Sequence, residues 1–241
     1  MGPVRVISLD RTPERWTAFQ DNNRGVVAFE RARAVDGLTL DRGELMRAGL
    51  LADPALYTDG ALGCALSHLA LWRACLQSGA PLTICEDDAI FHPDFPAHLD
   101  ALLKSSADQF DLMLWGWNFD AALSADLVPG LPFYGAFDQG ALRRSTTAWR
   151  EAPLDPLLLR LRRAFGNPGY TVTPRGARRL IEFCFPIRPL TVAFPQFDRS
   201  FPNTGVDVVM NAAYEQLDAY VSFPPLLITP NDTAASTVQV R

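Results

Sequence analysis

The sequence predicts an α/β fold in which an open sheet is flanked by helices, and three segments carry this prediction. Residues 4–9, which are apolar except for Arg5 and Ser8, are typical of a buried first strand, and Pro13 then marks the first position of a helix. In residues 61–78 the apolar side chains recur at helical spacing, and Gly79 follows as a stop. Residues 110–117 form a further apolar strand. Strands that alternate with helices are typical of α/β proteins.

Weaker patterns place the remaining regular elements. Strands are predicted over residues 26–31, 170–173 and 223–229, and helices over residues 174–184 and from Asp207 to about residue 217. Short helices and loops are expected between the second strand and the long helix.

Residues 121–153 and 186–203 are predicted to be irregular. The first stretch is rich in Pro, Gly and polar side chains, which indicates loops or an inserted lid, and the second is a proline-rich and aromatic loop. Between them, residues 154–165 are interpreted as an amphipathic helix with a basic side. Its basic residues are Arg160, Arg162 and Arg163. A surface helix is the simpler interpretation, and contact with anionic lipid or a phosphorylated glycolipid is the alternative.

The composition bounds the class of protein. With 241 residues, 48% of them hydrophobic and 20% charged, the chain fits a soluble globular domain with a substantial core. A net charge of −5 gives no electrostatic basis for binding nucleic acid. No apolar run has the length of a signal peptide or a membrane span. We therefore expect a cytoplasmic protein, with peripheral contact at the inner membrane face as the alternative.

The cysteines indicate a reducing environment. Cys64, Cys75, Cys85 and Cys184 show no C-x-x-C pair and no disulfide spacing. Cys64, His68 and Cys75 lie at positions that one helical face can share, which allows a zinc site in principle. Packing is the preferred interpretation of these cysteines, and His68 is interpreted as a hydrogen-bonded structural histidine.

The most informative segment is the acidic triplet Glu86-Asp87-Asp88, which ends an apolar run. Open α/β sheets keep their ligands at the carboxyl ends of strands. In an extended chain Glu86 and Asp88 share a face, so both can approach one cation if the chain turns there. Oxygen ligands favour Mg²⁺ or Mn²⁺, and such an ion completes its shell with substrate phosphates, so a nucleoside diphosphate is the natural partner. A solvated acidic loop after a buried strand is the alternative.

A second candidate binding site lies at the start of the first helix. Backbone amides there, next to Arg11 and Arg15, can receive a phosphate or ribose group, and Thr12 is predicted to cap the helix. A capped surface helix with two solvated arginines is the alternative, and the local sequence favours it.

Taken in order, these segments resemble glycosyltransferase family 25, which contains lipopolysaccharide and lipooligosaccharide sugar transferases and collagen galactosyltransferases. The strongest matches are Val6-Ile7-Ser8-Leu9-Asp10-Arg11 with Arg15, then Gly63-Cys64-Ala65-Leu66-Ser67-His68, and then Glu86-Asp87-Asp88-Ala89. Weaker matches are residues 169–177, Val206-Asp207 and the neighbourhood of Ser236. Cys85 departs from the pattern, because the family usually has an aliphatic residue there.

The resemblance implies a Rossmann-like glycosyltransferase fold of the A type, with a mixed central sheet flanked by helices in a single domain over residues 1–241. Residues 1–120 would hold the nucleotide sugar and residues 121–241 the acceptor. The implied activity is that of a metal-dependent, inverting hexosyltransferase. It would take galactose or glucose from a UDP-sugar and pass it to a saccharide or glycolipid acceptor, such as a lipopolysaccharide core.

The resemblance also implies the residues that bind the donor. Glu86 and Asp88 would hold Mn²⁺ or Mg²⁺ against the diphosphate, and Asp87 would bind the ribose or the donor sugar. The candidates for nucleotide contacts are Ser8, Arg11 and Arg15.

The same activity needs a carboxylate that removes the proton of the acceptor hydroxyl, because inversion in one displacement places that base opposite the leaving diphosphate. Asp207 is the first candidate for this base, and Asp120 is its competitor. The alternative for Asp207 is a carboxylate that only stabilises a helix N-terminus.

Two further functions compete with glycosyl transfer. The chain could be a catalytically degenerate protein of the same fold that binds a nucleotide sugar or a glycan. Nucleotidyl transfer ranks last, because residues 10–14, which follow the first strand, contain no glycine-rich phosphate loop.

Overall fold

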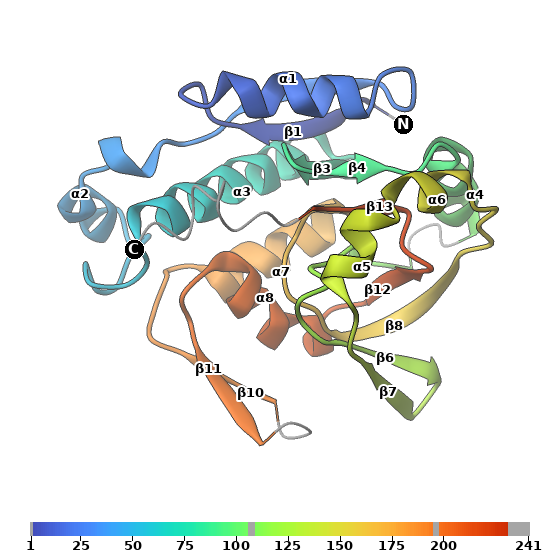
Figure 1. Cartoon of the computed structure of the whole chain (residues 1–241). Coiled ribbons are helices and arrows are strands. Elements are labelled where there is room, and N and C mark those ends of the chain that lie inside the picture. Colours follow the sequence, from blue (N-terminus) through green and yellow to red (C-terminus); the bar gives the residue numbers. More distant parts are fainter. Residues whose placement is uncertain (1, 106–108, 195–197, 231–241) are drawn as a thin grey trace.

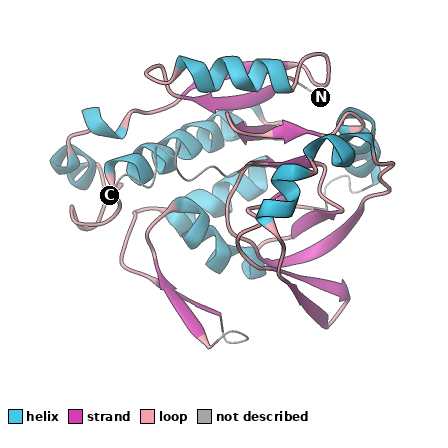
Figure 2. Ribbon diagram, viewed as in Figure 1, coloured by secondary structure: helices cyan, strands magenta, loops and turns pink. Residues whose placement is uncertain are grey.

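A nine-stranded mixed sheet runs through the molecule, and helices pack on both of its faces (Figures 1 and 2). The computed structural model describes residues 2–105, 109–194 and 198–230. The strands of this sheet are β1 (Val4–Ser8), β2 (Phe29–Arg33), β3 (Leu82–Glu86), β5 (Leu112–Gly116), β6 (Leu123–Val128), β7 (Leu131–Gly135), β8 (Leu157–Arg163), β9 (Gly169–Val172) and β12 (Ala219–Phe223). Their spatial order is β2-β1-β3-β9-β5-β12-β8-β6-β7.

The strand directions bring several carboxyl ends to one edge of the sheet. β1 runs parallel to β2 and β3, and β5 runs parallel to β12. β9 lies antiparallel between β3 and β5, so β1, β3 and β5 all end at the edge where β9 begins. The remaining strands, β8, β6 and β7, continue the sheet in antiparallel pairs. The predicted α/β fold with a mixed central sheet is confirmed.

Both faces of the central strands are buried. In β5, Leu112 and Leu114 pack against the core on one face, while Met113 and Trp115 pack against the core on the other. The first core includes side chains of α3 (Asp59–Ser78), α7 (Pro174–Cys184) and α8 (Val206–Ala213). The second includes side chains of α1 (Pro13–Asn22) and α4 (Phe95–Ser105). Burial on both faces explains why these strands are continuous apolar runs in the sequence.

The predicted helix boundaries are largely confirmed. Pro13 is the first residue of α1, and α3 ends at Gly79, whose φ of +67° is the left-handed conformation that favours glycine. Thr12 precedes α1 but its hydroxyl donates to the Leu9 carbonyl, so the prediction of a side-chain cap is wrong. A side-chain cap is present at α3, where the hydroxyl of Thr58 accepts from the Ala61 amide.

The predicted amphipathic helix over residues 154–165 is wrong, because this segment forms β8 between β12 and β6. Leu159 and Leu161 alternate with Arg160 and Arg162, and this period of two suits a strand. The arginines meet acidic residues of neighbouring segments. The ion pairs are Arg160–Asp218, Arg162–Asp126 and Arg163–Glu215. The basic helix face that suggested lipid contact is therefore not formed.

Residues 121–153 and 186–203, which were predicted to be irregular, contain regular elements. The first stretch forms β6, β7, α5 (Gln139–Arg144) and α6 (Thr146–Glu151). The second contains the antiparallel pair β10 (Thr191–Phe194) and β11 (Arg199–Pro202), which extends from the body in Figure 1. In the first stretch, β6 pairs with β8, which lies further along the chain, and such pairing leaves little local signal.

Other boundaries shift by a few residues. The predicted strand at residues 223–229 is split into β12 and β13 (Leu227–Ile228), with β13 paired to β4 (Ile90–Phe91). α8 ends at Ala213 rather than near residue 217, and a short helix, α2 (Arg42–Arg47), precedes α3. Ser236 lies outside the described residues. Within those residues, no helix combines the length and hydrophobicity needed to cross a bilayer.

A buried carboxylate ties the sheet to α7 at the edge opposite the carboxyl ends of β3 and β5. Asp111 is fully buried, and it accepts hydrogen bonds from Arg175 and Arg179 at 2.6 Å each and from the Asp218 amide at 3.0 Å. Burial alone would raise the pKa of Asp111, but these hydrogen bonds outweigh it and lower the pKa below its usual value. Asp111 thus joins β5, α7 and the start of β12.

Replacing this carboxylate tests its contribution to the fold. We expect Asp111→Asn to lower the free energy of unfolding by about 2 kcal/mol at pH 7, because two charge-assisted hydrogen bonds are lost. Since the folded pKa lies below the unfolded value of about 3.9, the contribution is present above that pH and disappears as the pH falls further. Urea unfolding of both proteins between pH 7 and pH 3 measures the difference. Asp100→Asn, on the exposed side of α4, is the control and should change little. A difference that stays constant down to pH 3 would contradict the assignment.

Candidate active site

A cavity of about 200 Å³ opens at the edge of the sheet where the parallel strands end. Leu9 follows β1, Val35 follows β2, Asp88 follows β3 and Asn118 follows β5, and all four line this cavity. Asn167, which comes just before β9, completes this wall. The cavity therefore lies in the crevice where open α/β sheets bind ligands.

The acidic triplet reaches this cavity through a turn at the end of β3. The Asp87 carboxylate is buried and accepts from Arg15, with the Arg15 Nε at 2.7 Å. Asp88 Oδ2 lies 3.7 Å from an Arg15 nitrogen, and its second oxygen, Oδ1, is buried without a hydrogen-bond partner among the described residues. Glu86, at the last position of β3, also lines the cavity. The predicted turn that brings the triplet to one site is present, and Arg15 compensates part of its charge.

Electrostatics make this cluster a fit for a hard cation. Burial raises the pKa of Asp88 to about 7, and the charge of Glu86 adds to this effect, while Arg15 and a hydrogen bond with Thr229 oppose it. A divalent ion would relieve the same repulsion that favours the proton. Carboxylate oxygens are the ligands that Mg²⁺ and Mn²⁺ prefer. Asp88 Oδ1 accepts no hydrogen bond from the described residues, so its lone pairs are available to a cation. Glu86 and Asp88 are therefore suitable ligands.

The motif Gly63–His68 shapes the cavity wall through α3. A Cβ on Gly63 would lie 2.5 Å from the Val35 carbonyl oxygen, so only glycine permits this approach of helix and loop. The Ser67 hydroxyl donates to the Gly63 carbonyl at 2.7 Å and accepts from the Val35 amide at 2.8 Å. Gly63 and Ser67 thus hold the segment after β2 against α3.

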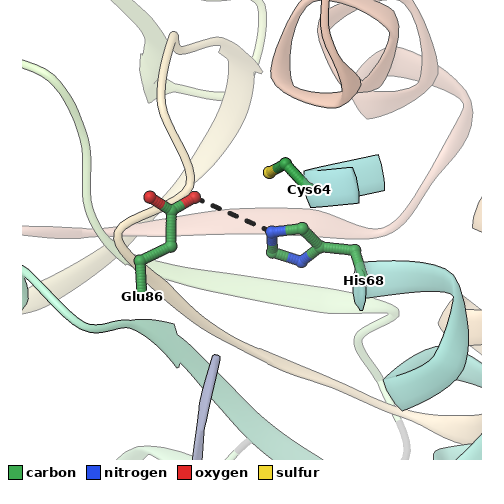
Figure 3. Close-up of side chains that lie close together, drawn as sticks. All are labelled: Cys64, His68 and Glu86. Carbon is green, nitrogen blue, oxygen red and sulfur yellow. Dashed lines mark ion pairs between the residues drawn. The ribbon is translucent and has the colours of Figure 1, made fainter. Parts of the chain in front are cut away.

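Cys64, His68 and Glu86 form a compact cluster at the cavity (Figure 3). Their ligand atoms all lie within 4.8 Å of one another, and His68 Nε2 is 3.7 Å from Glu86 Oε1. The predicted alternative of a zinc site with Cys75 is wrong, because the Cys75 thiol donates to the Val172 carbonyl, away from the cluster. The interpretation of His68 as a hydrogen-bonded histidine is confirmed, since its Nδ1 lies 2.8 Å from the Tyr170 hydroxyl.

Asp207 enters the cavity from the first turn of α8. Its Oδ2 accepts from the Gly166 amide at 3.2 Å. Burial raises the pKa of Asp207, and the charge of Glu86 adds to this, while backbone hydrogen bonds from Gly166 and Val208 oppose it. Asp120 is exposed and is not among the residues that line the cavity. The structure thus brings Asp207, but not Asp120, together with the acidic triplet.

The other predicted binding residues take different positions. Arg11 lines the cavity and pairs with Asp36, Nε to Oδ2, at 3.0 Å. Arg15 lines it as well and is held by Asp87, so it is not a solvated side chain of a plain surface helix, whereas Arg11 remains exposed. Ser8 is buried at the end of β1 and its hydroxyl has no hydrogen-bond partner among the described residues, but it does not line the cavity.

Several residues that line the cavity were missed from the sequence. They are Asn118, Gly166, Asn167, Pro168 and Thr229. The run Gly166-Asn167-Pro168-Gly169 is a turn signal directly before a strand, and Gly166 has a φ of +77°. That signal could have indicated a loop at the carboxyl edge. Nothing local distinguishes Asn118 or Thr229.

Comparison with known proteins gives relatives whose names contain the word glycosyltransferase. A segment of 148 residues is 30% identical to "Probable inactive glycosyltransferase 25 family member 3" of Rattus norvegicus, covering 55% of this chain and 26% of the relative. A segment of 121 residues is 34% identical to "Putative glycosyltransferase R655" of Acanthamoeba polyphaga mimivirus, covering 47% of this chain and 36% of the relative. The matches thus span about a quarter to a third of the length of these relatives.

Among solved structures, the crystal structure of A197 from STIV matches with a TM-score of 0.40 and 10% identity, over 92% of this chain and 81% of that chain. The likeness is too low to support an argument about function. The model of glycosyltransferase family 25, described as an LPS biosynthesis protein, matches residues 1–195. Because this match covers most of the chain, the protein belongs to glycosyltransferase family 25.

Proposed function

We propose that the chain transfers a hexose, galactose or glucose, from a UDP-sugar to a saccharide or glycolipid acceptor such as a lipopolysaccharide core, with inversion at the anomeric carbon. The observation that carries the proposal is a single cavity lined both by the acidic triplet 86–88 and by Asp207. The acidic triplet suits the cation that accompanies a diphosphate, and Asp207 suits the role of proton acceptor. Inverting transfer needs both functions in one site.

Glu86 and Asp88 are the proposed ligands of Mn²⁺ or Mg²⁺. When bound, the ion would neutralise the charge that develops on the leaving diphosphate. Asp87 is held by Arg15, and this pair is proposed to contact the ribose or the donor sugar. Arg11 lines the same cavity and pairs with Asp36, and a paired arginine can still donate to a phosphate or ribose oxygen. Ser8 ends β1 beside these groups, and its carbonyl accepts from the Ala34 amide at 3.0 Å.

Asp207 is the proposed base. A carboxyl group with a raised pKa accepts a proton more readily than a free aspartate does, and burial has this effect on Asp207. The Gly166 amide orients one of its oxygens. In the proposed step, Asp207 takes the proton of the acceptor hydroxyl as that oxygen forms a bond to the anomeric carbon and the bond to the diphosphate breaks. Asp120 stays the second candidate.

A second candidate function is binding without turnover. Two relatives carry the word inactive in their names, the Rattus norvegicus protein and "Inactive glycosyltransferase 25 family member 3" of Mus musculus, which is 29% identical over 148 residues. This chain keeps Glu86, Asp88 and Asp207 at one cavity, which supports transfer. Donor binding without sugar transfer or donor hydrolysis would favour the alternative.

Donor and metal binding are tested by thermal unfolding. We expect Mn²⁺ together with one UDP-hexose to stabilise the protein, by about 2.7 kcal/mol when the ligand stands at a hundred times its dissociation constant. Asp88→Asn should abolish this stabilisation. Without ligand, the variant should be as stable as the wild type, because the substitution removes one negative charge from a crowded acidic cluster. Asp100→Asn should bind normally. Stabilisation of Asp88→Asn equal to that of the wild type would refute the assigned metal ligand.

The identity of the base is tested by two matched substitutions. We expect Asp207→Asn to lower kcat by about 10²–10⁴-fold, the usual contribution of general base catalysis, while Mn²⁺-dependent binding of the UDP-sugar is retained. Asp120→Asn should keep most of the activity. The measurement is release of UDP in the presence of acceptor, with donor binding followed separately. If Asp120→Asn lost activity and Asp207→Asn kept it, the two assignments would be exchanged.

A further inference from the structure

Three buried aromatic and imidazole side chains form a hydrogen-bonded chain behind Glu86. Trp72 and His68 come from α3, and Tyr170 comes from β9; all three are fully buried. The indole Nε1 of Trp72 donates to the Tyr170 hydroxyl at 2.7 Å, and His68 Nδ1 lies 2.8 Å from the same hydroxyl. The imidazole of His68 also stacks on the Tyr170 ring, with centroids 5.7 Å apart. The position of the His68 ring is therefore fixed from one side.

The hydrogen-bond donors and acceptors of Trp72, Tyr170 and His68 determine which nitrogen of His68 carries the proton. An indole N–H is only a donor, so the Tyr170 oxygen must accept from Trp72. Tyr170 still has one hydrogen to donate in a buried place where an unpaired donor is costly. Its partner is His68 Nδ1, which must then be the unprotonated nitrogen. The proton of the imidazole is left on Nε2.

The carboxylate that lies near His68 Nε2 is that of Glu86, the candidate metal ligand. Glu86 Oε1 lies 3.7 Å from Nε2, just beyond hydrogen-bond distance, and Nε2 is buried without a hydrogen-bond partner among the described residues (Figure 3). Conversely, the part of the chain that the structure describes offers the Glu86 carboxylate no other ion pair or hydrogen bond. Glu86 is about one third exposed and has a long side chain, so a neighbouring donor limits its rotamers.

We propose that His68 is a positioning residue: its Nε2–H orients the Glu86 carboxylate so that the opposite oxygen faces the cavity and the cation. This inference rests on the proposed function, because it assigns Glu86 to the metal. Carboxylate ligands of metals are commonly held by a second hydrogen bond, and loss of such a partner costs about 10–100-fold in metal affinity.

The close approach of Cys64 suggests a different use, a site in which Cys64, His68 and Glu86 all bind one soft metal ion. Such a site needs the lone pair of His68 Nε2 and therefore a proton on Nδ1. Nδ1–H would then donate to the Tyr170 oxygen, which already accepts from Trp72, and the Tyr170 hydroxyl hydrogen would be left without a partner. The hydrogen-bond count thus favours the positioning role over metal binding by His68.

The tautomer is measured directly by long-range ¹H–¹⁵N correlation spectra of protein labelled at histidine. The chain has 3 histidines, and the His68 signals are those lost in His68→Gln. We expect the proton on Nε2 and an unprotonated Nδ1 in the protein without metal. A proton on Nδ1 would overturn the proposal, whatever the enzyme activity. A shift of the tautomer to Nδ1–H with added Zn²⁺ would instead support the cluster with Cys64.

The effect on Glu86 is measured by titrating Mn²⁺ in the presence of UDP and following the electron paramagnetic resonance signal of the free ion. We expect His68→Leu to weaken Mn²⁺ binding by about 10–100-fold. His68→Gln, whose amide can place a donor near the position of Nε2, should recover most of the affinity. His98→Gln, on α4, is the matched control and should bind as the wild type does.

A double-mutant cycle separates positioning from a general effect on the fold. In a Glu86→Gln background, which itself binds Mn²⁺ more weakly, His68→Leu should have little further effect, because the group that His68 orients is gone. Equal losses in both backgrounds would show a purely structural role and overturn the proposal. If the wild type itself binds no Mn²⁺ with UDP, the proposed function fails, and the positioning role that rests on it falls as well. Mn²⁺ binding by the wild type with an unchanged affinity in His68→Leu contradicts the positioning role alone.

Discussion

The passage of β9 between β3 and β5 is the constraint on which the rest of the structure depends. β9 is antiparallel to both neighbours, and its first residue, Gly169, packs under Leu227: a Cβ there would lie 2.3 Å from a methyl carbon of Leu227, so a larger residue would displace that side chain. Within the core, the Thr171 hydroxyl pairs with the Thr83 hydroxyl at 2.7 Å and accepts from the Trp115 indole at 2.9 Å. These polar contacts fix the register of three strands. One end of β9 thereby meets the cavity, and the other leads into α7, which Asp111 holds.

The parts of the fold that could be predicted are those whose signal is local. The long helix α3 has apolar spacing over many turns, and β5 is buried on both faces, so each is evident in its own residues. β8 was misread because its leucines satisfy a helical and an alternating pattern at once; pairing with β12 and β6 decides between them. β6 and β7 have still less intrinsic preference. Their strand conformation depends on β8, which lies more than twenty residues further along the chain.

The site divides in the same way. The acidic triplet could be found because carboxylates directly after a strand are conspicuous in a sequence, whereas Asp207 was singled out by the resemblance to the family. The cavity also contains neutral residues from loops, such as Asn118 and Thr229, which only the folded chain brings to the same place. The environment of each carboxylate is equally non-local. Arg15 compensates Asp87 from α1, and His68 approaches Glu86 from α3.

The contact between Gly63 and Val35 limits how this site can change during evolution. A Cβ on Gly37 would likewise lie 1.7 Å from the Asp59 carbonyl oxygen, so the segment after β2 rests on α3 through main-chain atoms. Substitutions cannot widen or narrow a wall made of backbone without moving the helix. A change in the shape of the cavity at this wall therefore depends on the side chains that line it, such as those of Ala34, Ala61 and Cys64.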